Sequence, residues 1–260
     1  AGINDLILGR AELPMPETVT EKNMRQIRAA RKLIRRKQRQ YETQNLQFAE
    51  MREDDGLKEY LDRTRFINKE GEVCEFTDLQ KHDLNLVLQK RYALLNWQQG
   101  SGKTAAVYHR AKYLLKFRRA RNVIILAPAI ATNMTWIPFL TVNKERFRTI
   151  QTAGDLDNVP EGTFLVVSTS MLRKLKRGLK RFIKHTSGKL CLVFDESDEI
   201  TNPTSQRTRN VLCIFRRLRY KILDTGTTTR NNIAELYSQF ELLYNNSVNM
   251  ICWSPQVYHE

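Results

Sequence analysis

The residues that decide the fold of this chain are YALLNWQQGSGKT, positions 92–104. This stretch begins as a short apolar strand, turns at Gly100 and Gly102, and continues from Ala105 with helix-forming residues. The two glycines let the backbone bend until its N–H groups point at an anion, and the positive end of the following helix faces the same point. The pattern therefore predicts a phosphate-binding loop between a strand and a helix, with an ordinary turn as the alternative.

The side chains of the loop match those that bind a nucleoside triphosphate. We expect Lys103 to lie near the β and γ phosphates and the hydroxyl of Thr104 to bind Mg²⁺. The rest of the predicted cradle is Gly100, Ser101 and Gly102. The full Walker A pattern has a further glycine where this chain has Trp97, so only the core of the motif is present. ATP and Mg²⁺ are the predicted cofactors.

Short apolar runs alternate with stretches long enough for a helix after this loop. The expected strands are Tyr92–Asn96, Val123–Ala127, Phe164–Ser168, Leu190–Phe194 and Lys221–Asp224. Strands that are apolar throughout and alternate with helices predict an α/β fold, with a parallel sheet covered by helices on both faces. Such sheets bind ligands at the carboxyl ends of their strands, which is where the predicted loop lies.

Two acids, Asp195 and Glu196, directly follow the apolar run Leu190–Phe194. An acid at the end of a buried strand beside a phosphate loop can bind Mg²⁺, and a second acid can orient or deprotonate the attacking water. We therefore predict nucleotide hydrolysis, with Lys103, Asp195 and Glu196 as the catalytic residues. Thr104 and Asp195 are the predicted metal ligands.

The composition points to a polyanionic partner. The chain has 260 residues, of which 43 are Lys or Arg and 28 are Asp or Glu, so its formal net charge is +15. An excess of this size suggests nucleic acid. No apolar run is as long as a membrane span, so we expect a soluble intracellular protein with no membrane partner, cytoplasmic in a prokaryote or phage and nuclear in a eukaryote. The 4 cysteines and 4 histidines lack the spacing of a metal site or a disulfide framework.

The chain is predicted to divide into a basic helical appendage, residues 1–75, and a main domain, residues 76–260. Signals between these parts are weak, although Arg65–Asn68 and Glu72–Phe76 around Gly71 could form a small hairpin.

A long helix is expected within the appendage. Thr18 with Glu21 forms a capping-box pattern, and the helix could continue to the breaker Asp54-Asp55-Gly56. Between Lys22 and Arg39 its sequence contains no acid and many bases. This basic face either contacts a phosphate backbone or an acidic partner, or is a solvated surface on a helix whose apolar stripe rests on the main domain.

Four further stretches match the motifs of one family. DESDEITNP at 195–203 is similar to motif II, and LDTGT at 223–227 with Asn231-Asn232 and Glu235-Leu236 is similar to motif III and the signature that follows it. ILAP at 125–128 with Trp136 is similar to motif Ia, and VVST at 166–169 with Leu172 to the next DNA-facing loop. The chain thus resembles the first RecA-like domain of the superfamily 2 helicases, and most closely the Swi/Snf-type double-stranded DNA translocases.

The resemblance implies roles for further residues. Gln80 lies where the family has an adenine-reading glutamine. The residues that would couple the nucleotide state to motion are Asp198, Thr225, Gly226 and Thr227. Those that would contact nucleic acid are Pro128, Ser168, Thr169, Arg173, Lys174, Lys176 and Arg177. The chain departs from the family at Asp198, Thr201 and Thr228, where the family has His, Lys and Pro, and at Trp97-Gln98-Gln99, where it has Asp-Glu-Met.

The segment Met171–Lys184 has apolar residues at helical spacing and basic residues opposite them. Its apolar face is expected in the core. Because the segment follows a loop that contacts DNA in the family, its basic face is predicted to track phosphates, with simple solvation as the alternative.

The sequence therefore predicts the N-terminal ATPase lobe of an ATP-driven double-stranded DNA translocase of the Swi/Snf type. One alternative is a strand-separating DNA helicase or RNA-dependent ATPase of the same superfamily, and another is a non-catalytic nucleic-acid-binding module with a vestigial nucleotide site. In the family, ATP lies between two RecA-like lobes, and the second supplies arginine fingers. We expect that second lobe to be a partner absent from these residues, so that they bind Mg-ATP weakly and hydrolyse it poorly.

Overall fold

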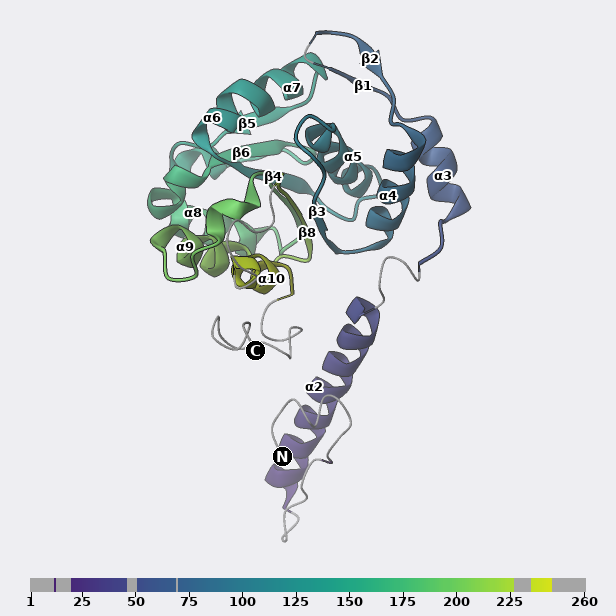
Figure 1. The fold of residues 1–260 in the computed structure, drawn as a ribbon. Helices are drawn as coiled ribbons and strands as arrows, with labels where there is room; N and C mark the ends of the chain where they lie inside the picture. The colour runs from purple at the N-terminus through teal and green to yellow at the C-terminus, as the bar shows by residue number, and fades with distance from the viewer. Residues whose placement is uncertain (1–11, 13–19, 46–50, 69, 227–234, 245–260) are drawn as a thin grey trace. The chain divides into compact units, whose positions relative to one another are not determined.

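The computed structural model describes residues 12, 20–45, 51–68, 70–226 and 235–244 (Figure 1). They form two units that are described separately: the first contains helix α2, and the second begins at Arg52. The predicted cap residue Thr18, the coupling residue Thr227 and the pair Asn231-Asn232 lie outside the described residues. None of the described helices is long and apolar enough to cross a membrane.

Helix α2 (Glu21–Asn45) confirms the helix expected in the appendage but not its ends. It begins at Glu21, and the Thr20 hydroxyl accepts a hydrogen bond from the N–H of Asn23 at 3.2 Å, so the cap is Thr20 rather than Thr18. The first turn also contains an ion pair of 2.6 Å between Glu21 and Arg25. The basic side chains from Lys22 to Arg35 are exposed.

The predicted helix breaker Asp54-Asp55-Gly56 instead begins helix α3 (Asp55–Asp62). The Asp54 carboxylate accepts from the N–H of Leu57 at 2.8 Å. The side chain of Asn85, in helix α4 (Asp78–Gln89), accepts from the N–H of Asp54 and donates to its carbonyl, both at 2.9 Å. Leu57 and Leu61 are buried in the same apolar cluster as α4 and helix α5 (Lys103–Lys116). The division at residue 76 stays a prediction, but residues 52–75 pack as part of the second unit.

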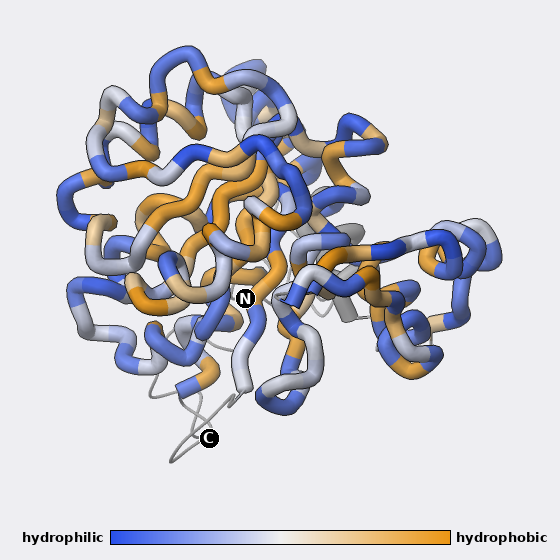
Figure 2. The backbone as a smooth tube through the Cα atoms, turned by 90° about the horizontal axis from the view of Figure 1, so that it is seen from above, coloured by the Kyte–Doolittle hydropathy of each residue, from blue (hydrophilic) through white to orange (hydrophobic). Residues whose placement is uncertain are grey.

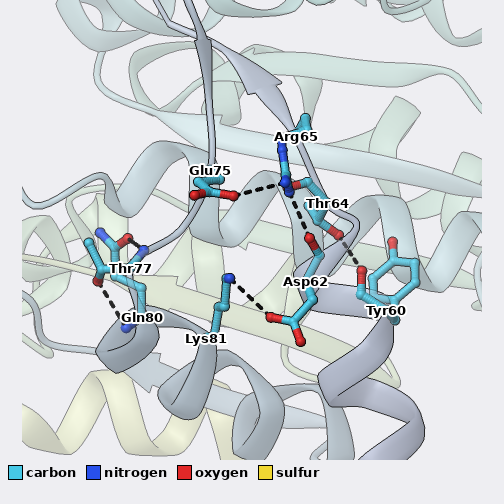
Figure 3. Close-up of polar contacts among 8 residues, drawn as sticks. All are labelled: Tyr60, Asp62, Thr64, Arg65, Glu75, Thr77, Gln80 and Lys81. Carbon is cyan, nitrogen blue, oxygen red and sulfur yellow. Dashed lines mark hydrogen bonds and ion pairs between the residues drawn. The ribbon is translucent and has the colours of Figure 1, made fainter.

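The small hairpin is confirmed: β1 (Phe66–Ile67) pairs antiparallel with β2 (Val73–Cys74). Figure 3 shows two ion pairs in this region. Arg65 and Glu75, which flank the hairpin, lie 2.9 Å apart, and Lys81 of α4 lies 3.0 Å from Asp62 of α3. Such partly exposed pairs contribute little individually, so the burial of Leu57, Leu61 and Phe76 holds this segment in place.

The second unit is built on a parallel sheet of six strands in the order β3-β8-β7-β4-β6-β5. The strands are β3 (Tyr92–Leu95), β4 (Asn122–Ala127), β5 (Phe147–Thr149), β6 (Phe164–Ser168), β7 (Leu190–Phe194) and β8 (Tyr220–Asp224). All five predicted strands are present. The additional strand β5 escaped prediction because it is a three-residue edge strand, Phe-Arg-Thr, without a continuous apolar run.

Helices cover both faces of the sheet, which confirms the predicted fold class (Figure 1). Alternate residues of β4 separate into two cores: Ile125 packs in the cluster with α4 and α5, and Ile124 in the cluster with α8, α9 and α10. The remaining helices are α5 (Lys103–Lys116), α6 (Ala129–Ala131), α7 (Ile137–Val142), α8 (Leu172–His185), α9 (Gln206–Phe215) and α10 (Leu236–Tyr244). Figure 2 shows the hydrophobic strands enclosed by more hydrophilic segments.

Lys221 is a buried charge in this otherwise apolar sheet. From β8 its amino group donates to the carbonyl of Arg216, after α9, at 2.7 Å, and to that of Leu242 in α10 at 2.5 Å. It also lies 4.9 Å from the centre of the Tyr92 ring. Burial lowers the pKa of Lys221 to about 7, against the opposing effect of Glu241. The side chain thus satisfies two helix carbonyls but at a cost in desolvation.

This buried lysine predicts a pH dependence of stability. Its folded-state pKa of about 7 lies below the ordinary 10.5, so between these values the unfolded chain binds more protons and stability rises with pH. The variant Lys221→Met should lack this contribution. In urea denaturation, the unfolding free energy of the wild type minus that of the variant should grow from pH 7 to 10, by at most about 1.4 kcal/mol per pH unit. Parallel pH profiles would contradict the assignment.

Candidate active site

The sheet order places three loops next to one another at the carboxyl edge. β8 lies between β3 and β7, and its last residues are in register with both: Asp224 pairs with Leu95, and Leu223 with Phe194. The glycine loop follows β3, the predicted coupling residues Thr225 and Gly226 follow β8, and the predicted acids follow β7. Side chains separated by more than a hundred positions in the sequence therefore meet at one edge.

The glycine loop has the backbone that its sequence predicts. Gly100 and Gly102 have φ angles of 82° and 81°, a left-handed conformation that glycine adopts without strain. Helix α5 begins at Lys103 with no side-chain cap and no acid in its first turn, so its first N–H groups can face an anion. The Lys103 amino group donates to the carbonyls of Trp97 at 3.1 Å and Gln98 at 3.4 Å, and so lies against the inner side of the loop.

Gln80 connects helix α4 to the glycine loop. Its side-chain oxygen accepts from the N–H of Thr77 at 2.8 Å, and the Thr77 hydroxyl accepts from the N–H of Gln80, which completes the capping box seen in Figure 3. Its side-chain nitrogen donates to the carbonyl of Ser101 at 2.8 Å. Gln80 therefore positions the loop, and its role in reading adenine stays a prediction.

Trp97, which replaces the first glycine of the motif, is also bonded to α4. Its indole N–H donates to the carboxylate of Asp83 at 2.8 Å. Beside it lies an open cleft of about 660 Å³. The cleft is lined by Phe66, Leu79, Gln80, Trp97, Gln98 and Gly102, among others. Apolar and amide groups thus adjoin the phosphate loop on the side of α4.

Asp195 is held by a residue whose role the sequence did not reveal. The indole N–H of Trp136 donates to one carboxylate oxygen of Asp195 at 2.7 Å, and both side chains are buried. Trp136 ends a short π-helical segment, Thr132–Trp136, next to α7. One oxygen of Asp195 is thereby oriented by the protein. Carboxylate oxygens are hard donors of the kind that Mg²⁺ prefers, so the second oxygen suits the predicted metal.

Glu196 adopts a left-handed backbone conformation, with φ and ψ both 53°. This is strained for a residue other than glycine and is found preferentially at functional positions. Burial raises the pKa of the Glu196 carboxyl, Asp195 and Asp198 raise it further, and Lys103 opposes the shift. A carboxyl with a raised pKa is better suited to take a proton near neutral pH.

The described coupling residues are in contact. The Thr225 hydroxyl donates to the Asp198 carboxylate at 3.3 Å, which links the loop after β8 to the one after β7. A Cβ atom placed on Gly226 would lie 3.5 Å from the Lys103 amino group, an ordinary contact distance, so the lysine lies directly beside the loop after β8. Ser197 adds a hydrogen bond of 2.9 Å to Gln239 of α10. Movement of the loop after β8 would therefore displace the groups bonded to it in the loop after β7.

Asp224 is a site residue that sequence reasoning missed. It is fully buried, and burial, followed by the neighbouring Asp195, raises its pKa well above the ordinary value. No N–H or O–H group of the described residues donates to its carboxyl oxygens. Burial beside a second carboxyl therefore favours the protonated form of Asp224 in the folded protein. The sequence does contain a signal for this residue: Asp224 is an acid at the end of an apolar strand, directly before the predicted coupling residue Thr225.

The predicted nucleic-acid residues lie along the ends of two adjacent strands and on α8. Pro128 follows β4, and Ser168 ends β6, in register with Ala127. Thr169 is buried, so its side chain is not presented to a ligand. On α8 the side chains of Arg173, Lys174 and Arg177 are exposed, and that of Lys176 is half-buried. The apolar face of α8 packs in the core as predicted.

The fold, the phosphate loop and the acids after β7 define the class of the domain: a RecA-like lobe of the P-loop ATPase type. Among solved structures it is similar to the SWI2/SNF2 ATPase core of Sulfolobus solfataricus in complex with dsDNA (TM-score 0.57, 16% identity, 71% of this chain and 38% of that one). It is also similar to that core domain alone, with a TM-score of 0.53, 17% identity, and 71% of this chain and 37% of that one covered. A third similar structure is the UvsW helicase from Bacteriophage T4, with a TM-score of 0.50, 14% identity, and 73% of this chain and 64% of that one covered. At these identities the likeness establishes the fold.

By sequence, the chain is similar to the ATP-dependent helicase FUN30 of Saccharomyces cerevisiae, with 25% identity over 204 residues. This alignment covers 73% of the chain and 17% of the yeast protein, so the chain spans less than a fifth of that relative. No protein-family model matches the chain. Together with the SWI2/SNF2 structures, this relative confirms the resemblance to Swi/Snf-type ATPases of helicase superfamily 2.

The raised pKa of Asp224, which keeps a proton on its carboxyl in the folded protein, predicts a second pH effect. Because the folded-state pKa of Asp224 lies above the ordinary 3.8, the folded protein binds more protons above that pH, and stability falls as the pH rises. Asp224→Asn keeps the size of the side chain and removes the titrating carboxyl. Its unfolding free energy, measured in urea, should exceed that of the wild type by an amount that grows above about pH 4, with a limiting slope of about 1.4 kcal/mol per pH unit. A constant difference would show that Asp224 does not hold this proton.

Proposed function

We propose that the chain is the N-terminal ATPase lobe of an ATP-driven double-stranded DNA translocase of the Swi/Snf type. The observation that carries this proposal is the meeting of the glycine loop, the acids after β7 and the Thr225-Gly226 loop at one edge of the sheet. Lys103 is close enough to Glu196 and Asp224 to affect their pKa values. A cation, acids and unbonded helix N–H groups in one place suit a metal-bound triphosphate.

In this proposal each side chain has a separate task. The N–H groups at the start of α5 and the Lys103 amino group bind phosphate oxygens, and Thr104 and Asp195 would hold Mg²⁺, which supplies further neutralisation of phosphate charge when bound. Both metal ligands offer oxygen donors, and Trp136 fixes the orientation of one of them. Glu196 orients the attacking water and takes its proton. The cleft beside Trp97 and Gln80 has the apolar and amide groups to receive the adenine base.

The proposed track is duplex DNA. The support is the positive charge of the chain, the exposed basic side chains of α8, and the fact that the similar Sulfolobus ATPase core was solved with dsDNA. A second RecA-like lobe of the same protein is the proposed partner that completes the ATP site with arginines.

Two variants test the nucleotide site. With Mg-ATP at about ten times its Kd, thermal melting of the wild type should show a stabilisation of about 1.4 kcal/mol. Lys103→Ala should abolish the shift, because it removes the cation at the phosphates. Glu196→Gln should keep the shift but lower the hydrolysis rate about a hundredfold or more, since only the base is lost. Melting unaffected by Mg-ATP in the wild type would instead favour a nucleic-acid-binding module with a vestigial site.

A charge-matched pair of variants tests the basic face of α8. Arg173→Gln with Arg177→Gln should weaken duplex binding whatever its sequence and reduce the slope of log K against log salt by about 0.9 for each phosphate that is no longer neutralised. The control is Lys58→Gln with Arg63→Gln at α3, which makes the same change of charge at two exposed residues. Equal effects of the two pairs would mean that only the overall charge of the domain matters. Comparing duplex with single-stranded DNA and RNA separates the translocase from the helicase and RNA-dependent alternatives.

A further inference from the structure

A second basic region lies at the amino edge of the sheet, opposite the nucleotide site. It is a cleft of about 670 Å³, which we call the amino-edge cleft. It is lined by residues from the segments that lead into four strands, β3, β4, β7 and β8. Its basic members are Lys90, Arg91, Arg118, Arg119, Lys189, Arg217 and Arg219.

The parallel topology brings these bases together. The strands β3, β8, β7 and β4 are consecutive in the sheet, so their amino ends are neighbours. With strands about 4.8 Å apart, the row of bases extends over roughly 14 Å. No single stretch of sequence reveals the cluster, because each strand contributes only one or two of its members.

Six of the seven bases of the amino-edge cleft form no ion pair within the part of the chain that the structure describes. No acid is among its lining residues, and no ion pair between described residues involves Arg91, Arg118, Arg119, Lys189, Arg217 or Arg219. These six side chains are exposed. Like charges gathered in this way repel one another and oppose folding, so the arrangement suits an anion that neutralises them.

The backbone that carries the bases is firmly held. Buried Arg110 donates to the carbonyls of Lys90 at 3.1 Å and Arg91 at 2.6 Å, and the N–H of Lys221 donates to the same Arg91 carbonyl at 3.0 Å. The Lys189 carbonyl accepts from the N–H of Arg121 at 2.8 Å. The strand ends therefore present their side chains from fixed positions, which limits the entropy lost when a ligand binds.

The guanidinium groups of two arginines also pack on rings. Arg119 lies 5.5 Å from the centre of the Tyr113 ring, and Arg219 lies 5.5 Å from that of Tyr220. Stacking of this kind restricts a long side chain without neutralising its charge.

We propose that the amino-edge cleft binds the phosphate backbone of a second nucleic-acid segment, separate from the one proposed for α8. Five of its seven bases are arginines, whose planar fork matches phosphate oxygens. A row of roughly 14 Å corresponds to about four phosphates of one strand. The exposed lining residues are all polar or charged, so the cleft offers no apolar pocket of the kind that peptide side chains fill. The choice of nucleic acid as the ligand rests on the proposed function, whereas the site itself is argued from the cleft alone.

The number of short DNA duplexes bound per chain tests this inference. Arg118→Glu with Arg217→Glu changes two exposed residues from different segments of the amino-edge cleft, neither packed on a ring in the structure. At saturation, measured by sedimentation of a labelled duplex of about 12 base pairs, this variant should bind one duplex fewer than the wild type. The control is Lys58→Glu with Arg63→Glu at α3, which makes the same change of charge and should bind as many as the wild type. Unchanged melting temperatures verify that both variants fold.

The outcomes also separate this inference from the proposed function. If the amino-edge variant binds as many duplexes as the wild type with the same affinity, the inference is wrong, whatever the α8 variant does. If the amino-edge variant loses a duplex while Arg173→Gln with Arg177→Gln loses none, the cleft is upheld and the α8 face is not. Displacement of the duplex from the cleft by polyglutamate at lower concentrations than by competing DNA would also overturn the inference, in favour of an acidic protein partner.

Discussion

The parallel pairing of β8 with β3 on one side and β7 on the other determines where the functional side chains of this domain lie. Had β8 been added at an edge, the glycine loop and the acids would be direct neighbours, with no third loop between them. Instead Thr225 and Gly226 lie between Lys103 and Asp198, and the hydrogen bond from Thr225 to Asp198 joins the loops. A change at the phosphates can thus reach the motif II loop through one short side chain.

The same pairing separates two kinds of charge. At the carboxyl edge, the strand ends carry Asp195, Glu196, Asp198 and Asp224, together with the cation Lys103. At the amino edge, the residues that line the amino-edge cleft include bases but no acid. Elsewhere at this edge, Arg121 before β4 forms an ion pair of 2.7 Å with Glu161 before β6, so the absence of acids applies to the cleft and not to the whole edge. The common strand direction places the proposed nucleotide site and the proposed polyanion-binding cleft at opposite edges of the sheet.

Most of the fold could be predicted because short, continuous stretches of sequence determine its strands and its glycine loop. The apolar runs predicted five of the strands of the main sheet, and GSGKT predicted the backbone of the loop. Long-range pairings could not be read in this way: Trp136 and Asp224 each meet Asp195 only because of the strand order. The prediction failed at Asp54 because Asp-Asp-Gly can end one helix or cap the next, and the choice depends on contacts distant in sequence, such as the two hydrogen bonds of Asn85 in α4.

The protonated state that burial favours for Asp224 has a consequence for the proposed metal site beside it. Two ionised carboxylates would repel each other strongly at this depth, and the proton removes most of that repulsion. If Asp195 holds the proposed Mg²⁺, the charge of the metal would favour the ionised form of nearby carboxyls, Asp224 among them. The new charge would lie next to Thr225, the residue that contacts Asp198. Occupation of the nucleotide site would in this way change the electrostatics of the coupling loop directly, without any movement of the sheet.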